Sequence, residues 1–367
     1  MRVHSESSFH YPLFRAAGSA RTLGRLHGEQ ARLKISAFLG WLCEALGIED
    51  RELAHRARRF LPLFETHCPH LLAEIEGLAE GAAISRDLGL ACQLRGELGQ
   101  VTPDGCTTFV IGPRGTADGN VLIGQTSDMP AEMREFCYVL HLEPDDRPEL
   151  IMWTFGGMIG YHGLNTSGVA HFANSLGGGP AWKFALSHYP LKRMILEQPD
   201  LPAVRSLMAR YPASSNGNYV LCDGQHQILD VELTPDGPFS IEDDGEGFLA
   251  HSNHYLCAPH NCQANFDQSL PDSFPRLERM RHLIRAKFGS LTREDMQEIL
   301  ADHDGHPVSI CRHPHAGYGD NILPASGRTV AAIIAEPNRG RFHLCCGNPC
   351  EQPFREYRLS TASPGTS

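Results

Sequence analysis

The feature that most constrains the fold is a change in the spacing of apolar residues about one hundred residues into the chain. Before that point apolar side chains recur at helical intervals. The first such series is Leu23, Leu26, Ala31, Ile35, Phe38, Leu42 and Leu46. After that point apolar residues alternate with polar ones or form short runs bounded by Gly, Pro and Asp, which is typical of strands. Helices therefore come first along the chain, and sheet follows.

Three helices are predicted in the first part of the chain. They cover Ser19 to about Leu46, Glu52 to Phe64, and a stretch with Leu71, Leu72, Ile75, Leu78 and Ala82. Pro62 is expected to disturb the end of the second helix, because proline has no backbone N–H and clashes with the preceding turn. Four later helices are predicted at Leu191 to Leu196, Ala203 to Arg210, Phe274 to Phe288 and Thr292 to His303.

Strands are predicted in three groups. The first group is Thr107 to Ile111, Val121 to Gly124, Tyr138 to Leu142, Leu150 to Thr154 and Gly168 to Ala173. The others are Tyr219 to Cys222, Ile228 to Leu233, Phe248 to Ala250, Val330 to Ala335 and Phe342 to Cys346. Helices, strands, helices and strands in that order are expected when two sheets stack and helices cover their outer faces. The predicted fold class is α+β, a four-layer α/β/β/α sandwich.

Charge and hydropathy exclude several classes of partner. The formal net charge of -11 offers no basic surface for nucleic acid, whose phosphates are bound by clustered Lys and Arg. No segment has the roughly 20 consecutive apolar residues that span a bilayer, and residues 1–11 lack the apolar core of a secretory signal. We therefore expect a cytoplasmic protein that binds neither nucleic acid nor membrane.

The 12 cysteines are expected to be reduced thiols, most of them buried in the core. Two groups could suggest a metal. They are Cys257, His260 and Cys262, and Cys345, Cys346 and Cys350. Neither group has paired C-x-x-C arms at zinc-finger spacing, so the sequence predicts no metal and no cofactor.

One cysteine stands in a context that favours chemistry. Cys106 follows Gly105 at the head of a predicted strand, within Asp104-Gly105-Cys106-Thr107-Thr108. Because glycine lacks a Cβ, its carbonyl is open to attack by the thiol that follows. The attack would give a thioester, and water would then release a chain that ends at Gly105. The alternative is that Cys106 only fills space in the core.

Such a cut would leave a new α-amino group on Cys106. That amine has a reference pKa near ~8, so its neutral form can accept the thiol proton. Nucleophile and base would then belong to one residue, and no separate catalytic histidine would be required.

Several motifs together resemble the isopenicillin N acyltransferase-like family, a cysteine branch of the self-processing N-terminal nucleophile hydrolases. The motifs are Gly24-Arg25-Leu26-His27-Gly28, Glu74-Ile75-Glu76-Gly77-Leu78-Ala79-Glu80-Gly81, Asp104-Gly105-Cys106-Thr107-Thr108, Ser252-Asn253-His254 and Ser309-Ile310-Cys311-Arg312. Their order and spacing carry the resemblance, which extends from about Gly18 to Glu351. It implies the N-terminal nucleophile hydrolase form of the four-layer sandwich.

The resemblance implies a role for each matching residue. Cys106 would be the nucleophile, and cleavage after Gly105 would give a mainly helical fragment 1–105 and a β-rich fragment 106–367, together one folded domain. Asn253 would offer its amide NH2 to the oxyanion, with turn capping as the alternative.

The same resemblance assigns Asp128 to processing and active-site organisation, although Ser127 and Met129 replace the aromatic neighbour usual in the family. Arg312 would pair with Asp128 or hold a substrate carboxylate. A turn cap at Asp128 and a surface salt bridge at Arg312 are the alternatives.

The resulting hypothesis is a self-processing cysteine amidohydrolase or acyltransferase that acts on a small linear amide or N-acyl amine through a Cys106 thioester. Its expected partners are a small-molecule amide or acyl donor and its own cleaved fragment. Three alternatives stay open. They are an acyl-CoA-dependent N-acyltransferase of the penicillin type, a conventional amidase that pairs Cys106 with a histidine such as His254, and a non-catalytic binding protein.

Overall fold

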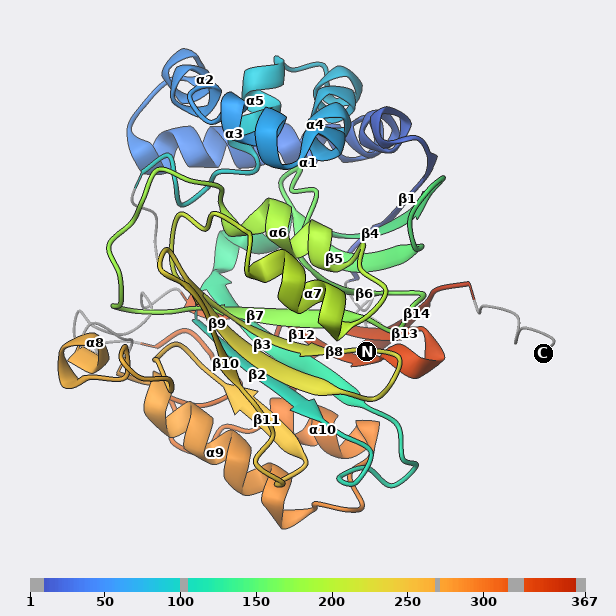
Figure 1. Ribbon diagram of the computed structural model, residues 1–367, viewed down its shortest axis with the longest axis vertical. Helices are drawn as coiled ribbons and strands as arrows, with labels where there is room; N and C mark the ends of the chain where they lie inside the picture. Colours follow the sequence, from blue (N-terminus) through green and yellow to red (C-terminus); the bar gives the residue numbers. More distant parts are fainter. Residues whose placement is uncertain (1–9, 100–104, 268–270, 316–326, 361–367) are drawn as a thin grey trace, which may run out of the picture.

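The computed structural model describes residues 10–99, 105–267, 271–315 and 327–360. Within them, two β-sheets lie face to face in the middle of the molecule, and helices cover both outer faces (Figure 1). The predicted four-layer α/β/β/α sandwich is confirmed. Its larger apolar core fills the space between the sheets and under the N-terminal helices, and a smaller core lies beneath the second sheet.

The first sheet has eight strands in the order β1-β4-β5-β6-β7-β8-β9-β10. Their bounds are Leu13–Gly18, Cys137–Pro144, Leu150–Phe155, His162–Asn165, Ala170–Ser175, Gly217–Cys222, Ile228–Thr234 and Gly237–Ile241. The second sheet has six strands in the order β11-β2-β3-β12-β13-β14. Their bounds are Phe248–His251, Gly105–Ile111, Leu122–Pro130, Gly327–Glu336, Arg341–Cys346 and Phe354–Arg358.

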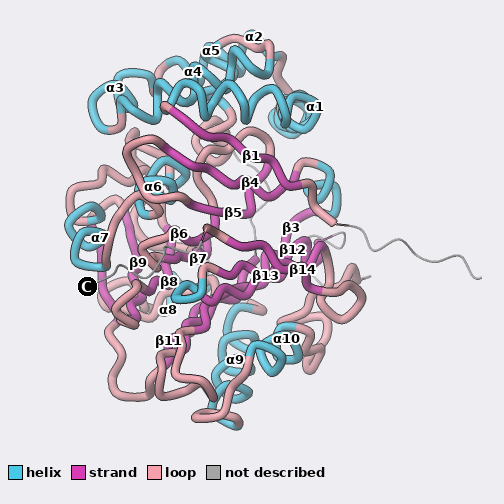
Figure 2. The backbone as a smooth tube through the Cα atoms, turned by 90° about the vertical axis from the view of Figure 1, so that its right-hand side faces the viewer, coloured by secondary structure: helices cyan, strands magenta, loops and turns pink. Residues whose placement is uncertain are grey.

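The helices divide between the two outer layers, as the tube view also shows (Figure 2). Over the first sheet lie α1 Ala20–Leu46, α2 Asp50–Arg58, α3 Leu61–His67, α4 Pro69–Ala82, α5 Arg86–Ala91, α6 His188–Ile195 and α7 Leu201–Met208. Over the second sheet lie α9 Ser273–Ala286 and α10 Arg293–Leu300. The short elements are α8 Gln263–Asp267, η1 Ala131–Glu135 and η2 Pro337–Arg339.

Local signals in the sequence set several of these boundaries. Ser19 caps α1 by accepting a hydrogen bond from Thr22, and Thr292 opens α10 with a capping box. Pro62 was expected to disturb the end of a single helix from Glu52 to Phe64, but it lies at the start of a separate helix. It stands in the first turn of α3, where a missing N–H costs nothing, so the predicted single helix is two helices. Four described strands were not predicted. Strands β1, β10 and β14 are short, partly exposed edge strands, and β6 is a buried strand of four residues.

Helices α1 and α4 pack with their backbones in close approach at four glycines. A Cβ on Gly24 would lie 1.8 Å from the carbonyl oxygen of Glu74, and one on Gly28 would lie 2.2 Å from that of Leu78. On the other helix, Gly77 and Gly81 approach α1 just as closely. The glycines of the two N-terminal motifs therefore serve helix packing, because any larger residue would separate the helices.

The N-terminal segment also joins the sheet layer. Strand β1 pairs in parallel with β4, although the other described strand pairs are antiparallel. Tyr11 donates a 2.7 Å hydrogen bond to the carbonyl of Val330 in the second sheet. The two predicted fragments thus share one core, while their separation by a cut after Gly105 stays a prediction. None of the described helices is both long enough and apolar enough to cross a membrane.

We expect Gly28→Ala to destabilise the protein by about 1–3 kcal/mol, because the added methyl overlaps the backbone of α4. The matched control is Gly40→Ala in the same helix, where a Cβ meets nothing within 4 Å. The control should gain up to about 1 kcal/mol from better helix propensity. Denaturant unfolding midpoints measure both, and a Gly28→Ala protein as stable as the wild type would contradict the packing argument.

Candidate active site

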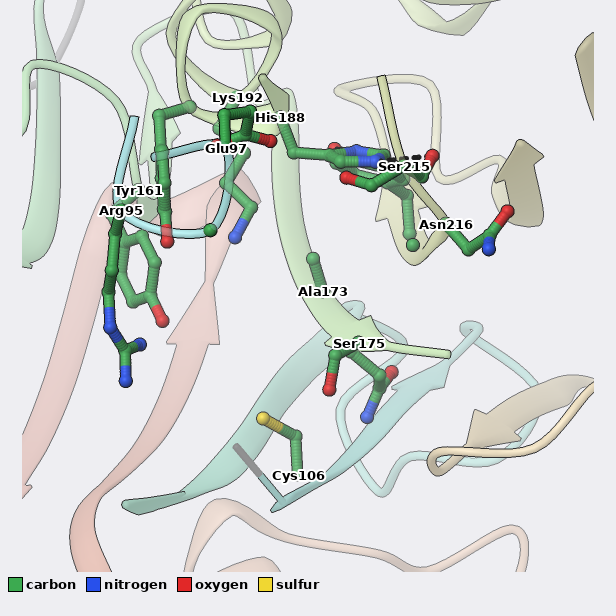
Figure 3. Close-up of a pocket in the computed structure, with 15 residues that line it drawn as sticks. Arg95, Glu97, Cys106, Tyr161, Ala173, Ser175, His188, Lys192, Ser215 and Asn216 are labelled. Carbon is green, nitrogen blue, oxygen red and sulfur yellow. Dashed lines mark hydrogen bonds between the residues drawn. The ribbon is translucent and has the colours of Figure 1, made fainter. Parts of the chain in front are cut away.

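Cys106 lies at the floor of a buried cavity of about 210 Å³. It is the second residue of β2, directly opposite Ser127 on β3, and only 3% exposed. Figure 3 shows its sulfur directed into the cavity, below Ala173 and Ser175 of β7. The remaining walls come from Arg95, Gly96, Glu97, Tyr161, Asn174, His188, Tyr189, Lys192, Ser215, Asn216, Gly217 and Tyr219. Both predicted fragments therefore line the cavity.

The backbone of Cys106 is held from both sides. Its N–H donates to Oδ1 of Asn253 at 3.2 Å, and its carbonyl accepts from Nη1 of Arg276 at 2.7 Å. Asn253 and Arg276 are themselves joined, since Nη2 of Arg276 donates to the same Oδ1 at 2.6 Å. All three residues are buried. The backbone of the nucleophile candidate is thus fixed in position, and its side chain lines the cavity.

Asn253 contacts the backbone of Cys106 through its amide oxygen, while the role expected of its NH2 group towards an oxyanion stays a prediction. Two donors, the Cys106 N–H and the Arg276 guanidinium, converge on one atom, which must therefore be the amide oxygen. The NH2 group donates to the Ser175 carbonyl at 2.9 Å and lies 3.4 Å from its hydroxyl. The amide NH2 therefore contacts β7 at Ser175, which lines the same cavity as Cys106, and the turn-capping alternative does not describe these contacts.

Arg276 is a site residue that the sequence reasoning missed. It also donates to Oγ1 of Thr107 at 2.8 Å, and its side chain is fully buried. A signal was available, because Arg276 shares one helical stripe of α9 with Met280 and Ile284, which pack in the core. An arginine on an apolar stripe indicates a buried partner.

Asp128 lies in β3, directly opposite Gly105, so the turn-cap alternative is wrong. It is fully buried, and its Oδ1 accepts a 2.7 Å hydrogen bond from Oγ1 of Thr329 on the neighbouring strand β12. Its position across the strand pair puts a carboxylate beside the bond that the sequence predicts to be cut.

Arg312 is also fully buried, which overturns the surface salt bridge alternative. Its Nε lies 3.7 Å from Oδ2 of Asp128, and its Nη2 contacts Oδ2 of Asp272. Asp272 pairs in turn with Arg276 across one turn of α9. Burial lowers the pKa of the Arg312 guanidinium, whereas Asp128 and Cys106 raise it. The predicted pairing with Asp128 is present.

Two arginines and two aspartates therefore form a charge-balanced network behind Cys106. Arg276, Arg312, Asp128 and Asp272 all have 0% exposure. Charges so deeply buried are tolerated only when they are paired, because each one loses its hydration. The four groups come from β3, the α9 region and the segment before β12, so the tertiary fold alone assembles them.

Comparison with known proteins identifies the family of the chain. A model of the acyl-coenzyme A:6-aminopenicillanic acid acyltransferase family matches residues 115–351, which include Asp128, Asn253 and Arg312. The chain belongs to this family. The family membership predicted from the sequence motifs is thereby confirmed.

Individual relatives support the assignment of the chain to this acyltransferase family. The 40 kDa form of acyl-coenzyme A:6-aminopenicillanic-acid-acyltransferase from Emericella nidulans is 27% identical over 335 residues, which cover 88% of this chain and 92% of the relative. Two variants of the conjugated bile acid hydrolase from Clostridium perfringens superpose with a TM-score of 0.50 at 11% identity. Each match covers 71% of this chain and 100% of the hydrolase, and it shows the shared N-terminal nucleophile hydrolase fold.

Two histidines near Cys106, His188 and His254, are engaged in other contacts. His188 lines the cavity, but its Nε2 donates to Ser215 and its Nδ1 accepts from Tyr219. His254, the candidate base of a conventional thiol amidase, contacts Ser273 through Nδ1 at 2.7 Å and stacks on Phe274. Burial lowers the pKa of His254 to about 3 and that of His188 to about 4. These contacts disfavour a Cys/His pair.

We expect Arg276→Met to cost about 3–5 kcal/mol of stability, because it leaves the buried charge of Asp272 with one partner fewer. The matched control is Arg279→Met on the same helix, where Arg279 is partly exposed and pairs with Asp302 and Asp304. Loss of these partly exposed pairs should cost about 1 kcal/mol, less than loss of the buried pair. Urea unfolding compares the two variants, and equal losses would contradict the role given to the buried network.

Proposed function

We propose that the protein is a self-processing cysteine amidohydrolase or acyltransferase whose nucleophile is Cys106, freed by cleavage after Gly105. One observation carries the proposal. The Cys106 thiol faces the cavity, while the side chains of Asn253 and Arg276 hold both backbone groups of the same residue.

The cleavage step uses groups that are already adjacent. The Cys106 sulfur attacks the Gly105 carbonyl carbon, the peptide C–N bond breaks, and the nitrogen takes up the thiol proton. Water then hydrolyses the thioester, which leaves a carboxylate on Gly105 and a thiol and an amine on Cys106. The Arg312–Asp128 pair lies beside this bond and would hold β3 against Gly105 during the reaction.

After cleavage the same contacts suit catalysis by the new amine. Oδ1 of Asn253 would keep accepting a hydrogen bond from the Cys106 nitrogen, which leaves the nitrogen lone pair available to the thiol. In turnover the sulfur attacks a substrate carbonyl, and the amine passes the thiol proton to the leaving amine. A thioester with the acyl group remains until water or a second amine takes that group.

The size of the cavity favours a substrate with a small acyl group, which would bind inside the cavity. Its volume of about 210 Å³ is below the roughly 300–1,000 Å³ of pockets for drug-sized ligands. Tyr161 and Tyr189 supply aromatic walls, and the Lys192 amine lies 4.2 Å from the Tyr161 ring centroid. Burial raises the pKa of Glu97, at the same cavity, to about 7, so its charge changes near neutral pH. A small N-acyl amine or N-acyl amino acid fits these walls.

An acyl-coenzyme A-dependent acyltransferase is the second candidate. It is favoured by the family match and by the Emericella nidulans relative, whose name specifies acyl-coenzyme A as donor and 6-aminopenicillanic acid as acceptor. Both candidates share the Cys106 thioester. They differ in the acyl donor, an amide or an acyl-coenzyme A, and in whether water or an amine removes the acyl group.

Intact mass spectrometry of the purified protein tests self-processing. We expect two fragments, one ending at Gly105 and one beginning at Cys106, which stay associated because they share one core. Cys106→Ala should remain a single chain, since no thiol is present to attack. The control Cys43→Ala, which changes a half-buried thiol on α1, should be cut like the wild type. A wild-type protein that stays whole and yet turns over amides would refute the proposal.

A partition experiment separates the two candidates. The processed protein is given an acyl-coenzyme A or a small N-acyl amine, with and without 6-aminopenicillanic acid, and products are measured by liquid chromatography and mass spectrometry. For the hydrolase we expect mainly free acid, whether or not the amine is added. Acyl product that grows with amine concentration at the expense of free acid would favour the acyltransferase. Cys106→Ala should give neither product, because both require the thioester.

A further inference from the structure

Four metal-ligating side chains meet at one point outside the cavity. They are His303, Cys311, His313 and Cys350, and their ligand atoms all lie within 4.8 Å of one another. His303 follows α10, Cys311 and His313 lie in the segment that carries Arg312, and Cys350 lies in the turn between β13 and β14. We propose that these four residues bind a structural zinc ion that joins the Arg312 segment to this turn.

The distances match a tetrahedral site. Zinc bonds of about 2.3 Å to sulfur and about 2.0 Å to nitrogen require separations of about 3.8 Å between sulfurs, 3.3 Å between nitrogens and 3.5 Å between unlike atoms. The sulfurs of Cys311 and Cys350 are 3.7 Å apart, and Nε2 of His303 is 3.0 Å from Nε2 of His313. Nε2 of His313 lies 3.7 Å and 3.3 Å from the two sulfurs.

The surrounding groups orient the ligands as they do in known metal sites. Nδ1 of His313 faces Oε1 of Glu351 at 3.4 Å, so a carboxylate would fix the ring with Nε2 towards the metal. Asn348 donates its amide to the Cys311 sulfur at 3.3 Å, which suits a thiolate. Two thiolates and two neutral imidazoles select zinc among common divalent ions.

The site is linked to the acyltransferase centre through the backbone. Cys311 and His313 flank Arg312 and contact each other, whereas the Arg312 side chain contacts Asp128 and Asp272. The side chains of Cys311 and His313 thus lie in the cluster, and the side chain of Arg312 between them lies in the buried network. A zinc ion would therefore fix the backbone from which Arg312 reaches the buried network.

The sequence predicted no metal because the ligands come from two distant segments. Of the two cysteine groups considered there, only Cys350 takes part. The second close group among the described residues contains His141, Glu143 and Glu149. It needs no ion, because Arg15 and Glu149 already occupy the two ring nitrogens of His141.

Metal analysis of the tag-free, full-length protein by plasma mass spectrometry tests the site. We expect one zinc ion per chain, and at least an about tenfold lower content in Cys350→Ser. The matched control is Cys262→Ser, which changes another exposed cysteine outside the cluster and should keep its zinc. Three results would overturn the proposal. The wild-type protein could contain no zinc although it was produced in zinc-replete medium, Cys350→Ser could contain as much zinc as the wild type, or the intact mass could show a disulfide between Cys311 and Cys350.

Cobalt substitution gives a second test that needs no variant. Co²⁺ added to chelator-treated wild-type protein should produce the thiolate charge-transfer bands and intense visible bands of tetrahedral coordination. It should also restore the thermal midpoint that chelation lowers, because the ion binds the folded state. A spectrum of octahedral Co²⁺ without thiolate bands would overturn the proposal. Neither readout depends on amide turnover, so the proposed function is tested separately.

Discussion

The pairing of Arg276 and Arg312 with Asp128 and Asp272 is the interaction on which the site depends. Each charge is fully buried, so each would be strongly unfavourable without its partners. Together they connect β3, α9 and the segment before β12, and Arg276 extends the network to the carbonyl of Cys106. These ion pairs and hydrogen bonds thus connect β3, α9 and the segment before β12 to Cys106 in β2.

The helical N-terminal part is held in place by different interactions. Glycines let α1 and α4 approach at backbone distance, and β1 adds a strand to the first sheet. Arg95 and Glu97 from this part also line the cavity. A cut after Gly105 would therefore leave two chains that still form one core and one pocket.

Much of the fold could be predicted from the sequence, because long amphipathic helices and apolar strands follow local periodicity. Prediction was weaker where local signals are small, as in β10 and β14. At the site the motifs indicated Cys106, Asp128, Asn253 and Arg312 as candidates, but not how the side chains are oriented. Asn253 turns its oxygen rather than its NH2 to Cys106, because the unpredicted Arg276 supplies a second donor.

By itself the sequence determined the order of helices and strands, the layered fold and the unusual Gly105-Cys106 pair. These features depend on residues that are close together in the sequence, so their spacing can be read from the sequence. Only the tertiary structure decided which charges neutralise one another behind Cys106, and that His303, Cys311, His313 and Cys350 converge. Such contacts join residues far apart in the chain, and their energies depend on burial and on distances that no local pattern records.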